Sequence, residues 1–295
     1  MQPTFKPPPA AIPADAGLHS ATARPAGSRQ DSPDLRSRTF RCMGTVISLT
    51  LPADECGTWE GEPVLDAATA AVERVFTGLD ATFSLYRPDS EASRLARGEV
   101  TLRDTSAAFR ARFADATGWR LLTDGFFTPE RPDGVLDLSG IIKGYAIDQG
   151  AAALAAAGVT DWCLNAGGDV LVSGSPRPEW GTPWMAGIVD PQDRGALLSG
   201  FALGGTGRCA ALATSGTAER GNHIWRGGAG RAGSGPIEFR QVSVAAPDIL
   251  TADVLATAIV AGGQRMLDWA TDSWDVEVLA VRGGGELLAT PGFRA

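Results

Sequence analysis

A run of short apolar segments separated by glycine-rich turns limits most strongly what this chain can fold into. Between residues 184 and 247 these segments follow one another without a helical pattern between them: WMAGIVDP, LLSGFALGG, CAALATSG, NHIW and QVSVAAP. Strands joined by short turns pair antiparallel, whereas parallel strands need a long, usually helical, crossover. The pattern predicts an α+β fold with mixed, largely antiparallel sheets and flanking helices. We expect a single compact unit of one or two lobes rather than a doubly wound parallel sheet.

The remaining segments divide the chain into a tail and one folded domain. Residues 1–37 are rich in Pro and Ala and are expected to be disordered, so the domain would cover residues 38–295. It would open with a β-rich run interrupted by Met-Gly-Thr, in which the glycine indicates a bulge or a close approach. Further elements follow from periodicity and turn residues. We expect helices at 65–78, 93–96, 105–124, 141–157 and 251–261, a strand end at 83–86, and hairpins at 162–174 and 274–290.

Composition excludes several classes of function. A net charge of -8 and a pI near 4.9 argue against general nucleic-acid binding, which needs a basic face. The four cysteines lack CxxC spacing, and His19 and His223 are the only histidines, so any metal would be held by oxygen ligands, as Mg2+ is. No apolar stretch is long enough for a transmembrane segment, and no signal-peptide pattern is visible, so we expect a cytoplasmic protein.

Residues 137–148, DLSGIIKGYAID, form the most informative stretch. A short apolar strand is expected to reach a Ser-Gly corner and continue as a helix with Lys143 in its first turn. A helix N-terminus carries partial positive charge, so a lysine there is unfavourable unless an anion lies in front of both. Free N–H groups at the corner and the Lys143 ammonium would suit a phosphate, and the carbonyl of Gly140 is sterically accessible to a ligand. A solvated lysine that happens to lie early in a helix is the alternative.

A second candidate site lies on the helix expected to open at Thr251. Asp253 and Thr257 are four residues apart, so a carboxylate and a hydroxyl, both hard oxygen ligands, share one helix face. Helix capping by Thr251 or Asp253, with Thr257 bonded to a backbone carbonyl, would explain the same residues without a metal. The metal hypothesis gains weight only if another stretch contacts the phosphates of a ligand.

Three weaker signals remain open when taken one at a time. The AGGD and ATSG corners at 166–169 and 213–216 could approach a ligand closely or could be ordinary turns. His223 could be a general base or a hydrogen-bonded structural histidine. The adjacent Phe126 and Phe127 could mark a site in a loop or cover the edge of the core.

Taken together and in order, these segments resemble the ApbE family of FAD:protein FMN transferases. The matching stretches span about 220 residues. They are CMGT (42–45), FSLYRPDSEASRL (83–95), DGFFTP (124–129), DLSGIIKGYAID (137–148), LNAGGDVLVSG (164–174), ATSGTAERGNHI (213–224) and TADVLATAIVAGG (251–263).

The resemblance implies an enzyme that uses Mg2+ to transfer FMN from FAD to a Thr or Ser hydroxyl of an acceptor flavoprotein, releasing AMP. It implies that His223 is the base and that Gly140, Asp253 and Thr257 hold the metal, with Asp253 also essential for catalysis. Residues implied to contact FAD are Met43, Tyr86, Phe126, Phe127, Thr128, Asp137, Lys143 and Ile224.

The chain departs from the family pattern at two places. Thr128 stands where the family usually has an acid, and WRGGAGRAGSGP follows the His-Ile pair where an Asp-Pro and Thr-Gly turn is common. These differences leave two alternatives: hydrolysis of FAD to FMN and AMP, or FAD binding without turnover.

Overall fold

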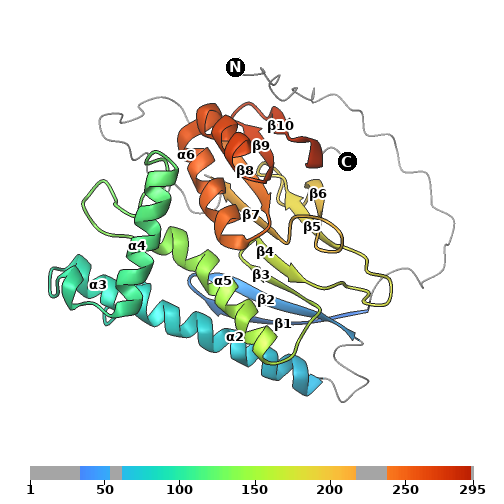
Figure 1. Cartoon of the computed structure of the whole chain (residues 1–295), viewed down its shortest axis with the longest axis horizontal. Coiled ribbons are helices and arrows are strands. Elements are labelled where there is room, and N and C mark those ends of the chain that lie inside the picture. The colour runs from blue at the N-terminus through green and yellow to red at the C-terminus, as the bar shows by residue number, and fades with distance from the viewer. Residues whose placement is uncertain (1–33, 54–61, 217–237, 294–295) are drawn as a thin grey trace, which may run out of the picture.

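The structure, a computed structural model, describes residues 34–53, 62–216 and 238–293. Figure 1 shows helices gathered over one large sheet, with a separate hairpin, β5 and β6, on its other side. The helices are α2 (Glu62–Phe83), α3 (Glu91–Ala96), α4 (Ala107–Leu122), α5 (Ser139–Ala156) and α6 (Ile249–Ser273). The strands are β1 (Leu35–Cys42), β2 (Thr45–Pro52), β3 (Trp162–Ala166), β4 (Asp169–Ser173), β5 (Trp184–Val189), β6 (Leu197–Leu203), β7 (Ala211–Gly216), β8 (Phe239–Ala246), β9 (Glu277–Arg282) and β10 (Leu287–Ala289).

The large sheet has the strand order β1-β2-β3-β4-β7-β8-β9-β10, and every neighbouring pair is antiparallel. The predicted α+β class with largely antiparallel sheets is therefore confirmed. Because the strands alternate in direction, the β1–β2 turn, the β3–β4 turn and the end of β7 lie at the same end of the sheet. This end carries the candidate site.

Two tight hairpin turns build that end of the sheet. Met43 and Gly44 have φ values of 50° and 71°, and Gly167 and Gly168 have values of 65° and 100°. Positive φ at both central positions is typical of the turn that matches the natural twist of paired strands. A side chain at Gly167 would collide with Thr45, so the two turns lie against each other. The glycine of Met-Gly-Thr thus forms a turn, and not the bulge that its place in a strand pattern suggested.

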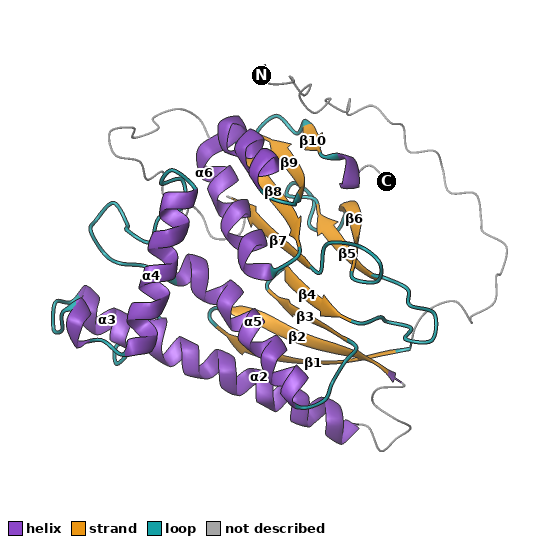
Figure 2. Cartoon of the chain, viewed as in Figure 1, coloured by secondary structure: helices purple, strands orange, loops and turns teal. Residues whose placement is uncertain are grey.

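The helices bury one face of this sheet, as Figure 2 shows. Helix α5 lies close to β3 because Gly150 has no side chain there. A Cβ at Gly150 would stand 3.1 Å from Leu164 and 3.4 Å from Val72. Alternate residues of the strands point into this core, which places Leu171 of β4 on the helix side.

The opposite face of the sheet is covered by β5 and β6. Along β5, Trp184, Ala186 and Ile188 are buried against the sheet, while the residues between them point outward. This strict alternation is the pattern of a strand with one buried face. Within the described ranges, no helix is long and apolar enough to cross a membrane. The cytoplasmic location expected from the sequence stays a prediction.

Several element boundaries differ from those expected. Phe83 is the last residue of α2 and stacks on Phe109 with ring centroids 5.2 Å apart, so the predicted strand end at 83–86 is wrong. Strand β1 begins at Leu35, earlier than the expected start at residue 38. Helix α6 continues to Ser273 through a break at Gly263, where φ is 62°.

Candidate active site

Lys143 of α5 lies between two buried carboxylates from distant parts of the chain. Its Nζ atom forms an ion pair with Asp169, the first residue of β4, and lies 3.4 Å from Oδ1 of Asp253 in α6. The side chain of Asp169 is 0% exposed, that of Asp253 is 4% exposed and that of Lys143 is 19% exposed. Buried charges are tolerated in proteins when they are paired. Within the described residues, this cluster combines two buried carboxylates with one ammonium.

Asp169 is fixed by a second contact on its other oxygen. The Thr214 N–H in β7 donates to Oδ1 of Asp169 over 3.1 Å. Asp169 and Leu171 are two residues apart in β4, so their side chains point to the same face of the sheet. Leu171 packs in the core under the helices, and Asp169 therefore faces the helices as well. One aspartate therefore links the start of β4, the end of β7 and the lysine of α5.

A pair of hydroxyls continues the site along α6. Thr257 lies one helical turn after Asp253, and its Oγ1 atom is 3.0 Å from Oγ of Ser215. Asp253 and Thr257 thus share one face of α6, as predicted. The N-terminus of the helix is capped by Asp248, whose side chain accepts a hydrogen bond from the Thr251 N–H. Capping does not account for Asp253.

Helices α5 and α6 approach each other closely at Gly144. A Cβ at Gly144 would lie 3.4 Å from Oδ2 of Asp253 and 3.4 Å from the Cα atom of Leu250. The glycine after Lys143 therefore leaves space beside the Asp253 carboxylate. Gly140, one turn earlier, has its open side toward the ring of Phe127, 3.1 Å away.

The start of α5 differs from the sequence prediction. The helix begins at Ser139, so Lys143 is its fifth residue and not part of its first turn. The segment before it is not a strand but makes only a single bridge, between Glu130 and Leu136. Asp137 accepts the Ser139 N–H at 2.9 Å.

The backbone at this helix start is also less available than predicted. The carbonyl of Leu138 accepts the N–H groups of both Ile141 and Ile142. Together with the Asp137 contact at Ser139, these bonds occupy most of the N–H groups expected to be free. The site at this corner therefore depends on the Lys143 side chain more than on the helix terminus.

The loop at 125–134 brings its two phenylalanines to different surroundings. Phe127 is buried, with 4% of its surface exposed, against Gly140. Phe126 packs beside Gly262 in α6, and the Arg265 guanidinium lies 5.5 Å from the centre of its ring. The Thr128 hydroxyl accepts the Glu130 N–H at 3.2 Å, which makes Thr128 a turn residue.

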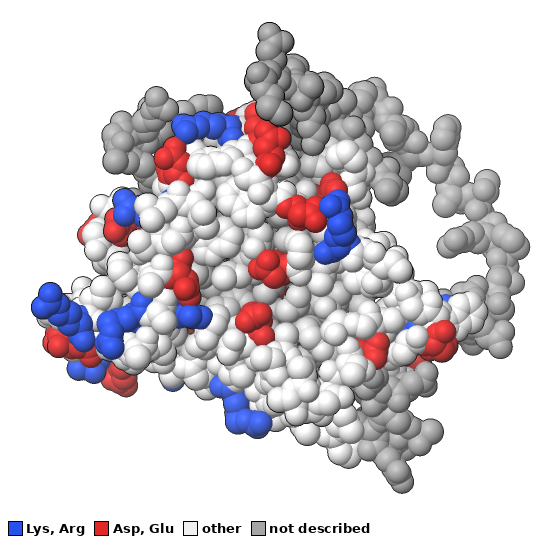
Figure 3. Space-filling view, viewed as in Figure 1, with Lys and Arg blue, Asp and Glu red and all other residues white. Residues whose placement is uncertain are grey.

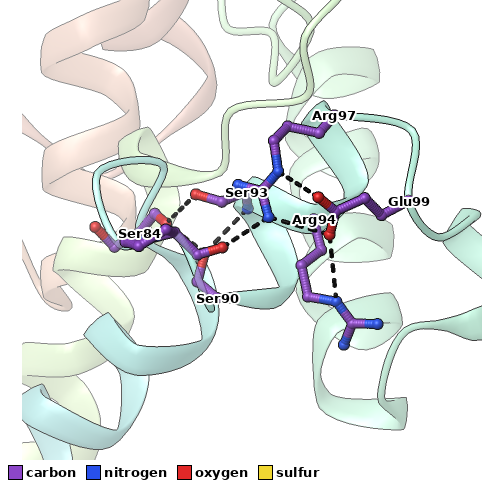
Figure 4. Close-up of polar contacts among 7 residues, drawn as sticks. Ser84, Ser90, Ser93, Arg94, Arg97 and Glu99 are labelled. Atoms are coloured by element: carbon purple, nitrogen blue, oxygen red, sulfur yellow. Dashed lines mark hydrogen bonds and ion pairs between the residues drawn. The ribbon is translucent and has the colours of Figure 1, made fainter.

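Tyr86 occupies an exposed turn between α2 and α3, with 89% of its surface accessible. Figure 4 shows how this turn is held: the Ser84 carbonyl accepts from the hydroxyls of Ser90 and Ser93, at 2.5 and 3.2 Å. Nearby, Arg97 is paired with Glu99. In Figure 3, basic and acidic side chains intermix at this corner of the molecule.

The Cys42–Met43 turn lies near the same helix end. Burial, followed by the nearby Asp80 carboxylate, raises the pKa of the Cys42 thiol, and Asp80 is paired with Arg87 in the Tyr86 turn. Cys42 therefore stays protonated at neutral pH and is not a reactive thiolate. The turns that carry Met43 and Tyr86, two of the predicted FAD contacts, are therefore linked through Asp80.

Two further predicted site residues, His223 and Ile224, lie outside the described residues.

The donor set of this site suits a magnesium ion that also binds a phosphate-bearing ligand. The described ranges contain no group of three or more His, Cys, Asp or Glu side chains that could enclose a metal. Mg2+ does not require one, because it is usually bound by one or two carboxylates together with water and substrate phosphates. The Asp253 carboxylate, with the Thr257 hydroxyl one turn away, meets that smaller requirement.

Sequence reasoning missed Asp169 and Ser215 as site residues. The AGGD and ATSG motifs predict backbone corners near a ligand, but they do not indicate a role for the Asp169 or Ser215 side chain. One signal was available: a carboxylate in the apolar stretch DVLV needs a buried partner, and Lys143 is the only lysine after Lys6.

Comparison with known proteins identifies the family. The model of the ApbE family matches residues 129–280, just over half of the chain. The chain belongs to the ApbE family. A relative from Rhodobacter capsulatus, named FAD:protein FMN transferase, is 34% identical over 173 residues, which make up 54% of this chain and 30% of that protein. This ApbE-family chain thus matches less than a third of that relative's length.

Solved structures of ApbE proteins share the fold of this family member. The apbE protein of Thermotoga maritima has a TM-score of 0.69 at 18% identity, covering 88% of this chain and 98% of that one. The flavin transferase ApbE of Vibrio cholerae has a TM-score of 0.67 at 21% identity, covering 89% and 99%. At these identities the likeness concerns the fold.

Proposed function

We propose that this chain transfers FMN from FAD to a Thr or Ser hydroxyl of an acceptor flavoprotein, with Mg2+ as cofactor and AMP as the second product. Membership of the ApbE family and the name of the Rhodobacter capsulatus relative support the reaction class. The observation that carries the proposal is the position of Lys143 between Asp169 and Asp253, with Thr257 one helical turn after Asp253 in α6. A cation for a phosphate and a carboxylate for a metal lie side by side there.

In this proposal, some of the site residues bind Mg2+ and the others bind FAD. Asp253, Thr257 and the carbonyl of Gly140 would hold Mg2+, and Lys143 would donate to a phosphate oxygen of FAD. Mg2+ would offset the negative charge of the pyrophosphate. Asp137 would lie near the adenylate side of FAD. The remaining proposed contacts to the dinucleotide are Met43, Tyr86, Phe126, Phe127, Thr128 and Ile224.

The transfer itself needs alignment and one base. The acceptor hydroxyl oxygen attacks the phosphorus of the FMN half, a new P–O ester bond forms, and the bond from that phosphorus to the bridging oxygen breaks. AMP leaves with the bridging oxygen. His223 takes the proton of the attacking hydroxyl, a task that a histidine side chain can perform near neutral pH. No covalent enzyme intermediate is required.

The test follows both products of one reaction. The purified protein is incubated with FAD, MgCl2 and a candidate acceptor domain, then AMP is quantified by chromatography and covalent flavin by in-gel fluorescence of the acceptor. Transfer requires both products in equal amounts. AMP without labelled acceptor would favour FAD hydrolysis, and FAD binding without AMP would favour a binding protein. Either result would contradict the proposed transfer.

Two variants test the assigned residues. Asp253→Ala should abolish Mg2+-dependent turnover and leave the fold intact, because it removes the only acidic ligand proposed for the metal. Asp272→Ala, on the exposed side of the same helix, is the matched control. His223→Ala should retain FAD binding and lose most transfer; a normal transfer rate would remove the base assignment.

A further inference from the structure

We propose that Gly262 and Arg265 of α6 are positioning residues that form a seat for the Phe126 ring and hold it in place for FAD. This rests on the proposed function only in taking Phe126 as a contact to FAD. Gly262 and Arg265 make no contact with FAD themselves. Their effect on FAD binding passes through Phe126.

Gly262 allows the ring to lie directly on the helix. A Cβ atom at this position would stand 2.8 Å from the Cγ and Cδ1 atoms of Phe126, where the atoms would overlap. Phe126 belongs to the loop between α4 and α5, so this contact joins that loop to α6. A side chain at position 262 would therefore push the ring away from the helix.

Arg265 holds the same loop at two points. Its guanidinium lies 5.5 Å from the centre of the Phe126 ring, within the range of a cation–π contact. The same guanidinium donates to Oδ2 of Asp124 at 2.8 Å, two residues before Phe126. The side chains of Arg265 and Asp124 are 58% and 57% exposed, so their ion pair adds little stability and mainly orients the guanidinium over the ring.

The backbone that carries Arg265 is fixed by a break in α6. Gly263 has a φ of 62° and interrupts the helix. The Glu238 carboxylate accepts the Gln264 N–H at 2.9 Å and pairs with Arg282, the last residue of β9, at 2.7 Å. The residues that follow the break are thus tied to the sheet, and Arg265 extends from a fixed point.

The two phenylalanines of the loop are held by different contacts. Phe127 is buried against Gly140 of α5, and its N–H donates to the Thr123 hydroxyl at 3.1 Å. Phe126 is only partly buried, so part of its surface stays accessible to a ligand. A change in the seat should therefore displace Phe126 and leave Phe127 in place.

The test measures the Kd for FAD by isothermal titration calorimetry in the presence of MgCl2 and without an acceptor. Phe126→Ala, Arg265→Gln, their double variant and Gly262→Ala are compared with wild type. Arg208→Gln is the matched control for Arg265→Gln, because Arg208 also forms an exposed ion pair with an aspartate and has the same charge. Gly118→Ala is the control for Gly262→Ala, since a Cβ atom at this α4 glycine would have no neighbour within 4 Å.

Arg265→Gln should raise the Kd for FAD about two- to fivefold, the contribution of one exposed cation–π contact. Gly262→Ala should raise it about three- to tenfold, the contribution of one aromatic contact. In the Phe126→Ala background, Arg265→Gln should change the Kd by less than about twofold, because the ring through which it acts is gone. Neither control should change the Kd.

A Kd in Arg265→Gln no different from that in Arg208→Gln would overturn the proposal. So would a full effect of Arg265→Gln in the absence of the Phe126 ring, because the arginine would then act on FAD directly. Circular dichroism checks that each protein is folded. Should Gly262→Ala not fold, Arg265→Gln and the double variant still decide.

Mn2+ binding distinguishes a positioning role from a general loosening of α6. Mn2+, a hard cation that stands in for Mg2+, is titrated in the absence of FAD and followed by electron paramagnetic resonance. Its Kd in Arg265→Gln should stay within about twofold of wild type, since the variant leaves Asp253 and Thr257 unchanged. A parallel loss of Mn2+ and FAD affinity would contradict the positioning role.

Phe126→Ala separates this proposal from the proposed function. If wild type does not bind FAD, or if Phe126→Ala binds FAD as wild type does, the proposed FAD contact is wrong and the seat falls with it. If Phe126→Ala weakens FAD binding and Arg265→Gln does not, only the seat is wrong.

Discussion

The hydroxyls of Ser215 and Thr257 lie 3.0 Å apart, which joins the end of β7 to α6 one turn beyond Asp253. Either hydroxyl could be the donor. In both cases the contact restricts the rotation of the Thr257 side chain. Ser215 therefore fixes the orientation of a proposed metal ligand.

Replacement of Ser215 by Ala should weaken this arrangement without unfolding the protein. Loss of one hydrogen bond is expected to cost about 1 kcal/mol of the free energy of unfolding. The Mg2+ concentration for half-maximal turnover should rise severalfold, measured at saturating FAD. Ser273→Ala, at the exposed end of α6, should change neither quantity. An unchanged Mg2+ requirement in Ser215→Ala would mean that Thr257 does not hold the metal.

The sequence predicted local features better than contacts between distant segments. The i,i+4 spacing was sufficient to place Asp253 and Thr257 on one helix face, and the strand pattern was sufficient for the antiparallel sheet. The pairing of Lys143 with Asp169 depends on how α5 crosses β4. That crossing is set by the packing of α5 against the sheet, where Gly150 allows a close approach. Local sequence patterns do not predict how a helix crosses a sheet.

Two boundaries were wrong for identifiable physical reasons. The alternating residues FSLY at 83–86 resemble a strand end, but Phe83 continues the buried face of α2 and stacks on Phe109. Tertiary packing overrode local preference there. At the start of α5, Asp137 accepts the Ser139 N–H two residues later, and the helix begins at Ser139, before the glycine. Lys143 was therefore placed one turn too early.

Two glycines in helices should respond in opposite ways to substitution by Ala. A methyl group at Gly150 would stand 3.1 Å from Leu164 in a buried interface, so Gly150→Ala should destabilise the fold by about 1–3 kcal/mol. Gly78 lies on the exposed side of α2, and a methyl group there would have no neighbouring atom within 4 Å, so Gly78→Ala should stabilise by roughly 0.5–1 kcal/mol. Urea unfolding of the two variants measures the sign of each change in the free energy of unfolding. Equal shifts would contradict the close packing of α5 on β3.

Cys163 should make stability fall at alkaline pH. Burial raises the pKa of this thiol from 9.0 to about 12. Between these values the folded state keeps a proton that the unfolded state loses, so the free energy of unfolding decreases as pH rises. The protonated thiol of Cys163 contributes its full share to the free energy of unfolding below pH 9, and that share is at most roughly 4 kcal/mol.

The Cys163→Ser variant isolates this effect because a serine hydroxyl does not titrate in the same range. Urea unfolding at pH 7.5, 9.5 and 10.5 should show a steeper loss of stability in the wild type than in the variant. All other titrating groups are common to both proteins. Parallel pH profiles would show that the folded-state pKa of Cys163 is not raised.

The turn that carries Tyr86 should depend on Ser90. This hydroxyl donates to the Ser84 carbonyl at 2.5 Å and accepts the Ser93 N–H at 3.0 Å, so it closes the turn and caps α3 (Figure 4). Ser90→Ala should cost about 1–2 kcal/mol of stability. Because Tyr86 is proposed to contact FAD, the KM for FAD should rise about three- to tenfold, with a smaller change in kcat. Ser106→Ala is the matched control, since Ser106 caps α4 through the Phe109 N–H in the same manner without touching the Tyr86 turn. Equal KM values in the two variants would show that the turn does not position Tyr86 for FAD.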